Sequence, residues 1–216
     1  MPPMQLFTVC MPAATACSQR ELREGGAVSQ FASLLAGAAP WRIQDKCHFG
    51  LPVFPSVEEV IGALDSDGPV YVIYPELITR AVSCFVKSFP GKTLYAVKAN
   101  PHAAVLKTIA AAGVNDFDIA SMQEAHLVRD LFPAATLYFM HPVKSRRAIS
   151  AAYAMGVREF ALDSMAELRK ISDETGQVPD LGLHVRIAVC QGNSVYDLSG
   201  KFGASPEAAV ELLQLA

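Results

Sequence analysis

Residues 93–101 read Thr-Leu-Tyr-Ala-Val-Lys-Ala-Asn-Pro, and they open the part of the chain in which a regular fold can be predicted. The apolar run from Leu94 to Val97 is typical of a strand, and Asn100-Pro101 ends it, because proline restricts the residue before it and donates no hydrogen bond. Lys98 is therefore predicted at the strand's last position. Crowding by apolar neighbours would disfavour its ammonium form, as a nucleophilic amine requires; the alternative is a strand-end lysine that reaches solvent.

From Thr93 onward, short apolar strands alternate with capped helices. The strands are predicted to begin near Thr93, Asp116, Thr136, Glu159 and Gly182. A serine that can accept a hydrogen bond from a free helical N–H precedes each of the four later helices: Ser121, Ser145, Ser164 and Ser205. This regular alternation is typical of parallel strands joined by crossover helices, so the predicted fold class is α/β.

Two architectures accept this alternation, a doubly wound open sheet and a (β/α)8 barrel of the TIM type. No strand is followed by the glycine pattern G-x-G-x-x-G, which is the usual sign of a dinucleotide-binding open sheet. Polar residues stand instead at the predicted carboxyl ends of the strands: Lys98, Asp118, His141, Asp163 and Arg186. Such residues converge on the ligand of a barrel, and the sequence therefore predicts an incomplete barrel with about five of its eight βα units.

The segments before Thr93 divide into a predicted arm and the start of the barrel. Residues 1–68 are expected to form an N-terminal arm of uncertain fold, in which a capping box at Ser56 opens a short helix. Residues 69–216 are expected to form the N-terminal portion of the barrel, beginning with a strand over 69–73. A helix from about Pro75 to Lys87 follows, and its apolar residues fall on one stripe: Leu77, Ile78, Ala81, Val82 and Phe85.

Composition makes several classes of partner unfavourable. The chain has 18 basic and 21 acidic residues and a net charge of −3, so no basic face for nucleic acid is expected. No apolar run reaches the roughly 18 residues of a membrane helix, and no membrane association is expected. Five widely spaced cysteines without a C-x-x-C pair predict neither a disulfide framework nor a metal site. These features favour a cytoplasmic protein.

Six segments of the chain follow one another in a recognisable order. They are residues 95–100, 117–121 with Glu124, 141–144, 163–164 with 167–168, 184–187 and 198–203. Together they resemble the fold-type III, pyridoxal-phosphate-dependent amino acid decarboxylases, most closely the ornithine decarboxylase branch. Diaminopimelate decarboxylases share the lysine and Lys-Phe-Gly signatures. The resemblance covers roughly residues 69–216, and several motifs in one order are more specific than any one alone.

The resemblance implies a role for five residues. Lys98 would bind pyridoxal phosphate covalently, and Asp118, Glu124 and Arg186 would lie in the cofactor pocket. Lys201 would lie near the partner subunit of a homodimer. The implied substrate is a small basic amino acid, with ornithine converted to putrescine as the favoured reaction and lysine, arginine or diaminopimelate left open.

Structural roles are open for the same residues. Asp118 is equally consistent with a strand-end residue that helps to begin a helix, and Glu124 completes the capping box of Ser121. Arg186 is placed in the fifth strand, where a buried ion pair to Asp118 or Asp163 is the alternative to cofactor binding. His184 is predicted to be a satisfied core histidine. The polar loop over residues 190–197 follows the fifth strand and is a candidate lid.

Several parts of the resembled family have no counterpart in the sequence. They are a His-Val-Gly-Ser strand, a glycine-rich phosphate-binding turn, a Glu-Pro-Gly-Arg segment and a C-terminal β-domain. We therefore expect the 216-residue chain to be inactive and poorly folded by itself. Three functions stay open at this point: a decarboxylase represented by an incomplete chain, a cofactor-binding barrel without decarboxylase activity, and a non-enzymatic fragment that associates with intact homologues.

Overall fold

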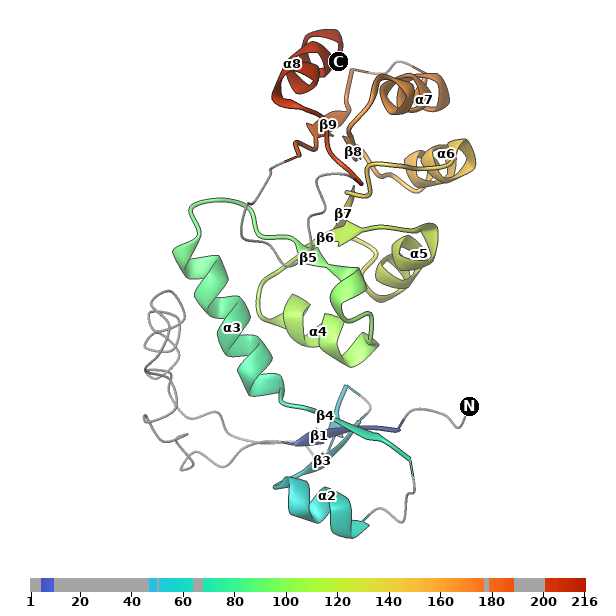
Figure 1. Cartoon of the computed structure of the whole chain (residues 1–216). Coiled ribbons are helices and arrows are strands. Elements are labelled where there is room, and N and C mark those ends of the chain that lie inside the picture. The colour runs from blue at the N-terminus through green and yellow to red at the C-terminus, as the bar shows by residue number, and fades with distance from the viewer. Residues whose placement is uncertain (1–4, 10–46, 50, 64–67, 177–178, 189–200) are drawn as a thin grey trace. The chain divides into compact units, whose positions relative to one another are not determined.

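The computed structural model describes residues 5–9, 47–49, 51–63, 68–176, 179–188 and 201–216 (Figure 1). The chain divides into two compact units. One comprises Met1–Thr93 and Asn100–Val114, and the other comprises Leu94–Ala99 and Asn115–Ala216. The predicted candidate residues all belong to the second unit, which contains a sheet of its own.

The second unit is built on a parallel sheet of five strands. These are β5 (Tyr95–Ala96), β6 (Asp116–Ile119), β7 (Thr136–Phe139), β8 (Glu159–Leu162) and β9 (Gly182–Val185). The strands pair in sequence order, β5-β6-β7-β8-β9. A doubly wound sheet reverses its strand order at a switch point, whereas a barrel adds each strand beside the previous one. The observed order confirms the predicted incomplete barrel, and four of the five strands begin at the predicted residue.

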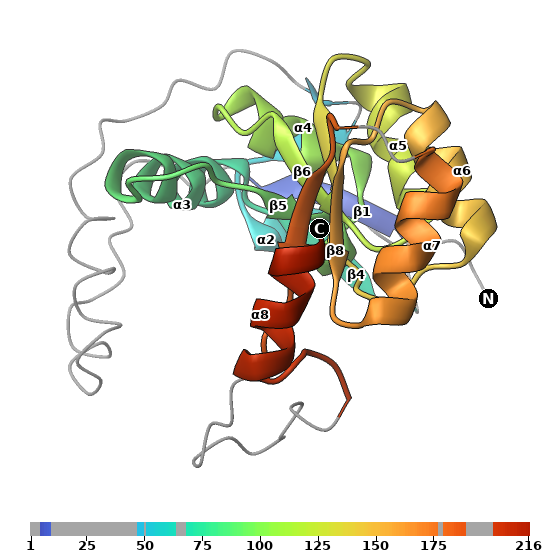
Figure 2. The ribbon, with the colours of Figure 1, turned by 90° about the horizontal axis from the view of Figure 1, so that it is seen from above.

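Four helices of this unit begin at the predicted serines. They are α5 (Met122–Leu131), α6 (Arg146–Ala154), α7 (Met165–Thr175) and α8 (Pro206–Leu215). Each capping hydroxyl accepts a hydrogen bond from the backbone N–H three residues later, at 3.1–3.3 Å. Figures 1 and 2 show α5, α6 and α7 side by side along one face of the sheet. Local capping therefore fixes where the chain leaves each strand and turns back over the sheet.

The two faces of the sheet differ because side chains alternate along each strand. The apolar set is buried at 2% exposure or less: Phe117, Ile119, Leu137, Phe139, Phe160 and Leu162. Phe117 stacks on Phe132, which caps the end of α5, so this set lies against the helices. Asp116, Asp118, Tyr138, Glu159 and His184 lie at the alternate positions and give the opposite face its polar character.

The first unit contains a four-stranded sheet of order β2-β3-β1-β4. Its strands are β1 (Gln5–Val9), β2 (Cys47–His48), β3 (Leu51–Phe54) and β4 (Val70–Ile73). Strand β1 runs parallel to both β3 and β4, and β2 is antiparallel to β3. The segment 1–68, for which the sequence predicted no fold beyond one short helix, thus contributes three strands.

The helices of the first unit are α2 (Val57–Ala63), α3 (Pro75–Ser88) and α4 (Ala103–Ala111). The bounds of α3 agree with the prediction, but its apolar stripe is only partly covered. Ile78 and Val82 are half-buried, whereas Leu77 and Phe85 are 45% and 50% exposed. The 3.6-residue period identified the helix correctly, because it reports amphipathic character. It does not report which side of the helix another element covers.

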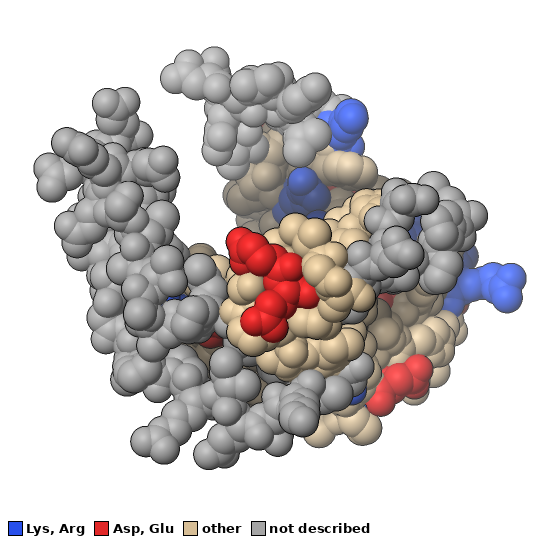
Figure 3. Space-filling view, turned by 90° about the horizontal axis from the view of Figure 1, so that it is seen from below, with Lys and Arg blue, Asp and Glu red and all other residues tan. Residues whose placement is uncertain are grey.

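The helix α2 begins with acidic side chains. The first turn of α2 carries Glu58 and Glu59, which favour the helix because they lie at the positive end of its dipole. Figure 3 shows one compact acidic group near the centre of the view and a second acidic group apart from it. Within the described residues, no helix is both long enough and apolar enough to cross a membrane.

Candidate active site

Lys98 lies just beyond the end of β5, in the 3-10 turn Val97–Ala99. The predicted strand is therefore too long, because the extended backbone ends at Ala96. Val97 is fully buried and anchors the turn, and the Lys98 side chain that follows it is exposed, so its predicted apolar crowding is wrong. Among the described residues the amine of Lys98 has neither a hydrogen bond nor an ion pair. A free amine at the carboxyl end of a parallel strand is accessible to a carbonyl compound.

Asp118 lies beside this turn on the neighbouring strand. It is paired in register with Ala96, two residues before Lys98. Burial raises the pKa of the half-buried Asp118 carboxyl, while the positive charge of Lys98 lowers it and the negative charge of Glu124 raises it. Both charged neighbours therefore affect the pKa of the Asp118 carboxyl, and burial affects it most.

Glu124 holds the turn between β6 and α5. Its backbone N–H donates to the Ser121 hydroxyl at 3.2 Å, and its Oε2 accepts from the Ala120 N–H at 2.8 Å. In the usual capping box the glutamate accepts from the N-cap residue itself, and here it reaches one residue further back. The predicted capping role is confirmed, and the same contacts fix the carboxylate within electrostatic range of Asp118.

Arg186 directly follows β9, and its backbone donates to the Leu162 carbonyl at 2.8 Å. The buried ion pair, which the sequence left open as the alternative to cofactor binding, is not observed: the side chain is exposed, and neither Asp118 nor Asp163 pairs with it in the described structure. Its guanidinium carbon lies 5.3 Å from the centre of the Phe202 ring. Within the described residues, the side chain thus contacts an aromatic ring in place of a carboxylate. Its N–H donors are available to an anion.

Asp163 binds the segment that carries Lys201. Its Oδ2 accepts a hydrogen bond from the Gly203 N–H at 2.9 Å. Gly203 has φ 102°, and a β-carbon there would lie 2.6 Å from the backbone nitrogen of Ala188, so only glycine fits this approach. Lys201 is exposed two residues before Gly203. The candidate lid loop over 190–197 and residues 198–200 lie outside the described part of the chain.

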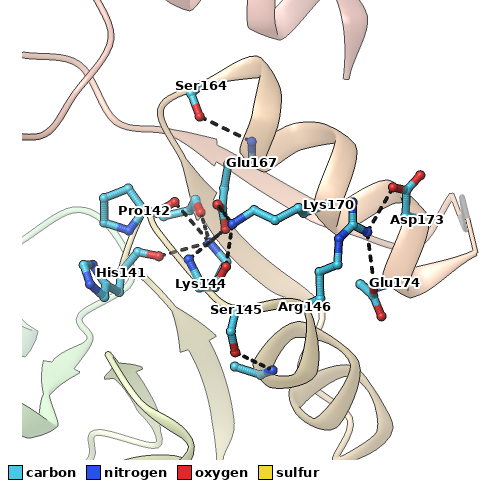
Figure 4. A network of polar contacts seen from close by, with 12 residues as sticks. His141, Pro142, Lys144, Ser145, Arg146, Ser164, Glu167, Lys170, Asp173 and Glu174 are labelled. Atoms are coloured by element: carbon cyan, nitrogen blue, oxygen red, sulfur yellow. Dashed lines mark hydrogen bonds and ion pairs between the residues drawn. The ribbon is translucent and has the colours of Figure 1, made fainter.

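A buried ion cluster, which sequence reasoning missed, joins the loop before α6 to the helix α7 (Figure 4). The ammonium of Lys144 lies 3.0 Å from Glu167 Oε1, and both side chains are at most 3% exposed. Lys144 also donates to the carbonyl oxygens of His141 and Ala161, and Lys170 pairs with the second oxygen of Glu167. Burial lowers the pKa of Lys144, and Glu167 opposes that shift. The cluster ties the carboxyl end of β7 to that of β8.

Two histidines differ in their surroundings. His141 follows β7, and its ring contacts Phe202 edge to face at a centroid distance of 5.5 Å. The predicted core position of His184 is wrong, since its side chain is 48% exposed; its Nε2 lies 2.7 Å from Glu159 Oε2. This pair lies on the polar face of the sheet.

The structure brings the predicted residues into two groups. Lys98, Asp118 and Glu124 interact electrostatically at the end of β5 and β6. Arg186 gathers with His141 and Phe202 at the ends of β7 and β9. Parallel strands present their carboxyl ends on the same side, which is where barrel enzymes bind their ligands. No three acidic, histidine or cysteine side chains of the described residues are placed to hold a metal ion.

A comparison with protein families identifies this arrangement. The profile described as pyridoxal-dependent decarboxylase, pyridoxal binding domain, matches residues 76–216. The chain belongs to this family. The matched region contains every candidate residue and the complete five-stranded sheet, so the decarboxylase resemblance seen in the motifs is confirmed.

Three solved structures similar to this chain are described as decarboxylases of basic amino acids. Lysine/ornithine decarboxylase from Vibrio vulnificus, complexed with putrescine, is 30% identical with TM-score 0.62 and covers 74% of this chain and 42% of its own. The arginine decarboxylase of Paramecium bursaria Chlorella virus is 30% identical with TM-score 0.57, covering 65% and 38%. Ornithine decarboxylase from Entamoeba histolytica is 26% identical with TM-score 0.52, covering 65% and 37%.

The decarboxylase chain thus spans less than half the length of these solved structures. Among curated proteins, no sequence matches it significantly. The shared region is the pyridoxal-binding barrel, which is the part that carries the candidate residues.

The side chains of the decarboxylase chain fit pyridoxal phosphate. The cofactor has an aldehyde, for which the unpaired amine of Lys98 is a suitable nucleophile. It also carries negative charge, and the guanidinium of Arg186 has no carboxylate partner among the described residues. The donor set at the strand ends therefore matches the chemistry of the cofactor that defines the family.

Replacing Asp118 by asparagine is expected to stabilise the decarboxylase domain at pH 7 by less than about 1 kcal/mol. Burial raises the pKa of Asp118 above 3.8, so the folded protein binds this proton more tightly than the unfolded chain. The resulting stabilisation is complete below pH 3.8 and is lost as the pH rises through the folded-state pKa. Urea unfolding at pH 4 and pH 7 measures the free energy of unfolding of both proteins. The excess stability of Asp118→Asn over the wild type must be larger at pH 7.

The matched control is Asp130→Asn, which changes an exposed carboxyl on α5. We expect this variant to be no more stable than the wild type at either pH 4 or pH 7. Equal gains for Asp118→Asn at both pH values would contradict the assignment of the effect to its buried charge.

Proposed function

We propose that this domain serves in the pyridoxal-phosphate-dependent decarboxylation of a basic amino acid, with ornithine as substrate and putrescine as product. The observation that carries the proposal is the unpaired, exposed amine of Lys98 at the carboxyl end of a barrel strand, with the Asp118 carboxyl beside it. Residues 69–216 would supply the N-terminal portion of the barrel, and residues 1–68 an N-terminal extension.

The proposed roles follow from the surroundings of each side chain. Lys98 is the attachment point for the aldehyde of the cofactor, which, when bound, accepts the electron pair released with CO2. Asp118 favours positive charge on the nitrogen of Lys98, since opposite charges at this range stabilise each other. Glu124 fixes the turn that holds Asp118 and adds to the negative potential there.

Arg186 is proposed to hold an anionic group at the end of β9. Its guanidinium offers planar N–H donors, and charge-assisted hydrogen bonds to anions are about twice as strong as neutral ones. Arg186 is exposed and has no carboxylate partner among the described residues, so none of their carboxylates occupies these donors. The contact with an aromatic ring restricts the guanidinium without consuming any donor.

Ornithine is proposed because three independent neighbours share one substrate class. Their names include ornithine, lysine and arginine decarboxylases, all of which act on amino acids with a distal cation. The motifs of the chain favour the ornithine branch of this class. We also propose that the protein is a cytoplasmic homodimer in which the exposed Lys201 lies at the subunit interface.

Substrate choice is tested on the natural protein, purified from the cells that produce it. Carboxyl-labelled ornithine, lysine, arginine and diaminopimelate are supplied in parallel with pyridoxal phosphate, and released CO2 is counted. We expect the highest kcat/KM for ornithine and putrescine as the co-product. Faster release from another of the four would replace ornithine by that substrate, and saturable cofactor binding without CO2 release from any would favour a cofactor-binding protein that is not a decarboxylase.

A further inference from the structure

The ring of Phe202 contacts two residues that come from different strands. Arg186, after β9, lies with its guanidinium carbon 5.3 Å from the ring centre, and His141, after β7, meets the ring edge to face at 5.5 Å. Phe202 itself is half-buried and comes from neither strand. One aromatic side chain thus links two polar groups that the sheet alone would hold separately.

The backbone around Phe202 is held by several independent contacts. Asp163, after β8, accepts from the Gly203 N–H at 2.9 Å. Ala204 donates to the Arg186 carbonyl at 2.8 Å and accepts from the Ala188 N–H at 2.9 Å, which makes a parallel bridge beside β9. The ring is therefore carried on a fixed segment that spans the ends of β8 and β9.

We propose that Phe202 is a positioning residue, which orients the guanidinium of Arg186 and the imidazole of His141 toward the cofactor. The proposal rests on the proposed function. A guanidinium held by the ring is attracted through its positive charge, while its N–H bonds remain free to donate to an anion. A carboxylate partner would fix Arg186 equally well, but it would occupy those donors.

The ring also restricts rotation of a long side chain. An exposed arginine loses rotamer freedom when it binds an anion, and that loss weakens binding. Contact with Phe202 removes part of this freedom before the ligand arrives. Phe202 therefore acts through Arg186, and its contribution to the affinity for the cofactor must disappear when Arg186 is absent.

The first experiment measures the Kd for pyridoxal phosphate in a double-mutant cycle. Phe202→Leu keeps an apolar side chain but removes the ring, and we expect it to weaken binding about three- to fivefold, as for an exposed cation–π contact. In an Arg186→Met background the same change is expected to alter Kd by less than about 1.5-fold. Phe202→Tyr, which retains the ring, is expected to bind like the wild type.

A second measurement needs no cofactor. Phenylglyoxal modifies accessible arginines, and peptide mass spectrometry gives the rate at each position. We expect Phe202→Leu to raise the modification rate of Arg186 severalfold, because one face of the guanidinium is no longer covered. The exposed Arg147 and Arg169, on α6 and α7, are internal controls whose rates stay constant.

The control variant is Phe132→Leu, which makes the same change at a ring stacked on Phe117 at the far end of α5. It is expected to lower stability without changing the Kd or the modification of Arg186. Equal effects of Phe202→Leu on Kd with and without Arg186, or an unchanged Arg186 rate, would overturn the positioning role. Failure of the wild type to bind pyridoxal phosphate would overturn the proposed function instead, and the phenylglyoxal rates would then decide the role of Phe202 alone.

Discussion

Lys98→Ala is expected to abolish covalent attachment of pyridoxal phosphate to the protein. The amine of Lys98 is the nucleophile assigned to the cofactor aldehyde, and alanine has no group that can replace it. The fold should survive the change, because the side chain is exposed and makes no hydrogen bond or ion pair within the described residues. A complete loss of attachment with little loss of stability is the expected result.

Borohydride reduction followed by peptide mass spectrometry measures the attachment directly. The wild-type protein, purified from the cells that naturally produce it, should yield one pyridoxyl-modified peptide containing Lys98 as the dominant product. Lys87→Ala, which removes an exposed lysine near the end of α3, is the matched control and should label like the wild type. Undiminished labelling of the Lys98→Ala protein at another lysine would contradict the assignment of the site.

Glu167→Gln is expected to cost about 3–5 kcal/mol of unfolding free energy, the usual cost of removing one partner from a buried ion pair. Glu167 is the only carboxylate that contacts the buried ammonium of Lys144 in the described structure, and it also pairs with Lys170. Glutamine keeps the shape but removes the negative charge between two cations. Since domains of this size are typically stable by about 5–15 kcal/mol, a large part of the stability would be lost.

Urea denaturation monitored by circular dichroism gives the change in free energy. The matched control is Asp173→Asn, which breaks an exposed pair with Arg146 and should cost less than about 1 kcal/mol. Adding Lys144→Met to Glu167→Gln should recover stability, because the uncompensated buried charge is then removed. A cost for Glu167→Gln no larger than that of the exposed control would show that the cluster is not important for folding.

The elements that local chemistry controls could be predicted from the sequence. A serine hydroxyl that caps a helix acts on an N–H only three residues away, so Ser121, Ser145, Ser164 and Ser205 identified the helix starts correctly. Strand starts followed from short apolar runs between these caps. The order of the motifs also identified the decarboxylase family, which the match over residues 76–216 confirms.

The errors arose where a side chain's surroundings depend on distant segments. Lys98 was expected among apolar neighbours, but a 3-10 turn places Val97 in the core and Lys98 outside it. For Arg186 the sequence left a buried ion pair and cofactor binding both open, and could not show the contact with Phe202, which reaches it from another segment. Composition and periodicity describe a residue's own element, whereas these contacts depend on where that element ends.

The sequence by itself determined the α/β class, the succession of strands and helices, and the residues that stand at the strand ends. Only the tertiary structure decided how those residues are partnered. Lys144 and Glu167 were both visible in the motifs, but nothing local joins two residues 23 positions apart. Their pairing follows from parallel strands β7 and β8, which bring the loop before α6 beside the first turn of α7, and from burial, which requires each charge to find a partner.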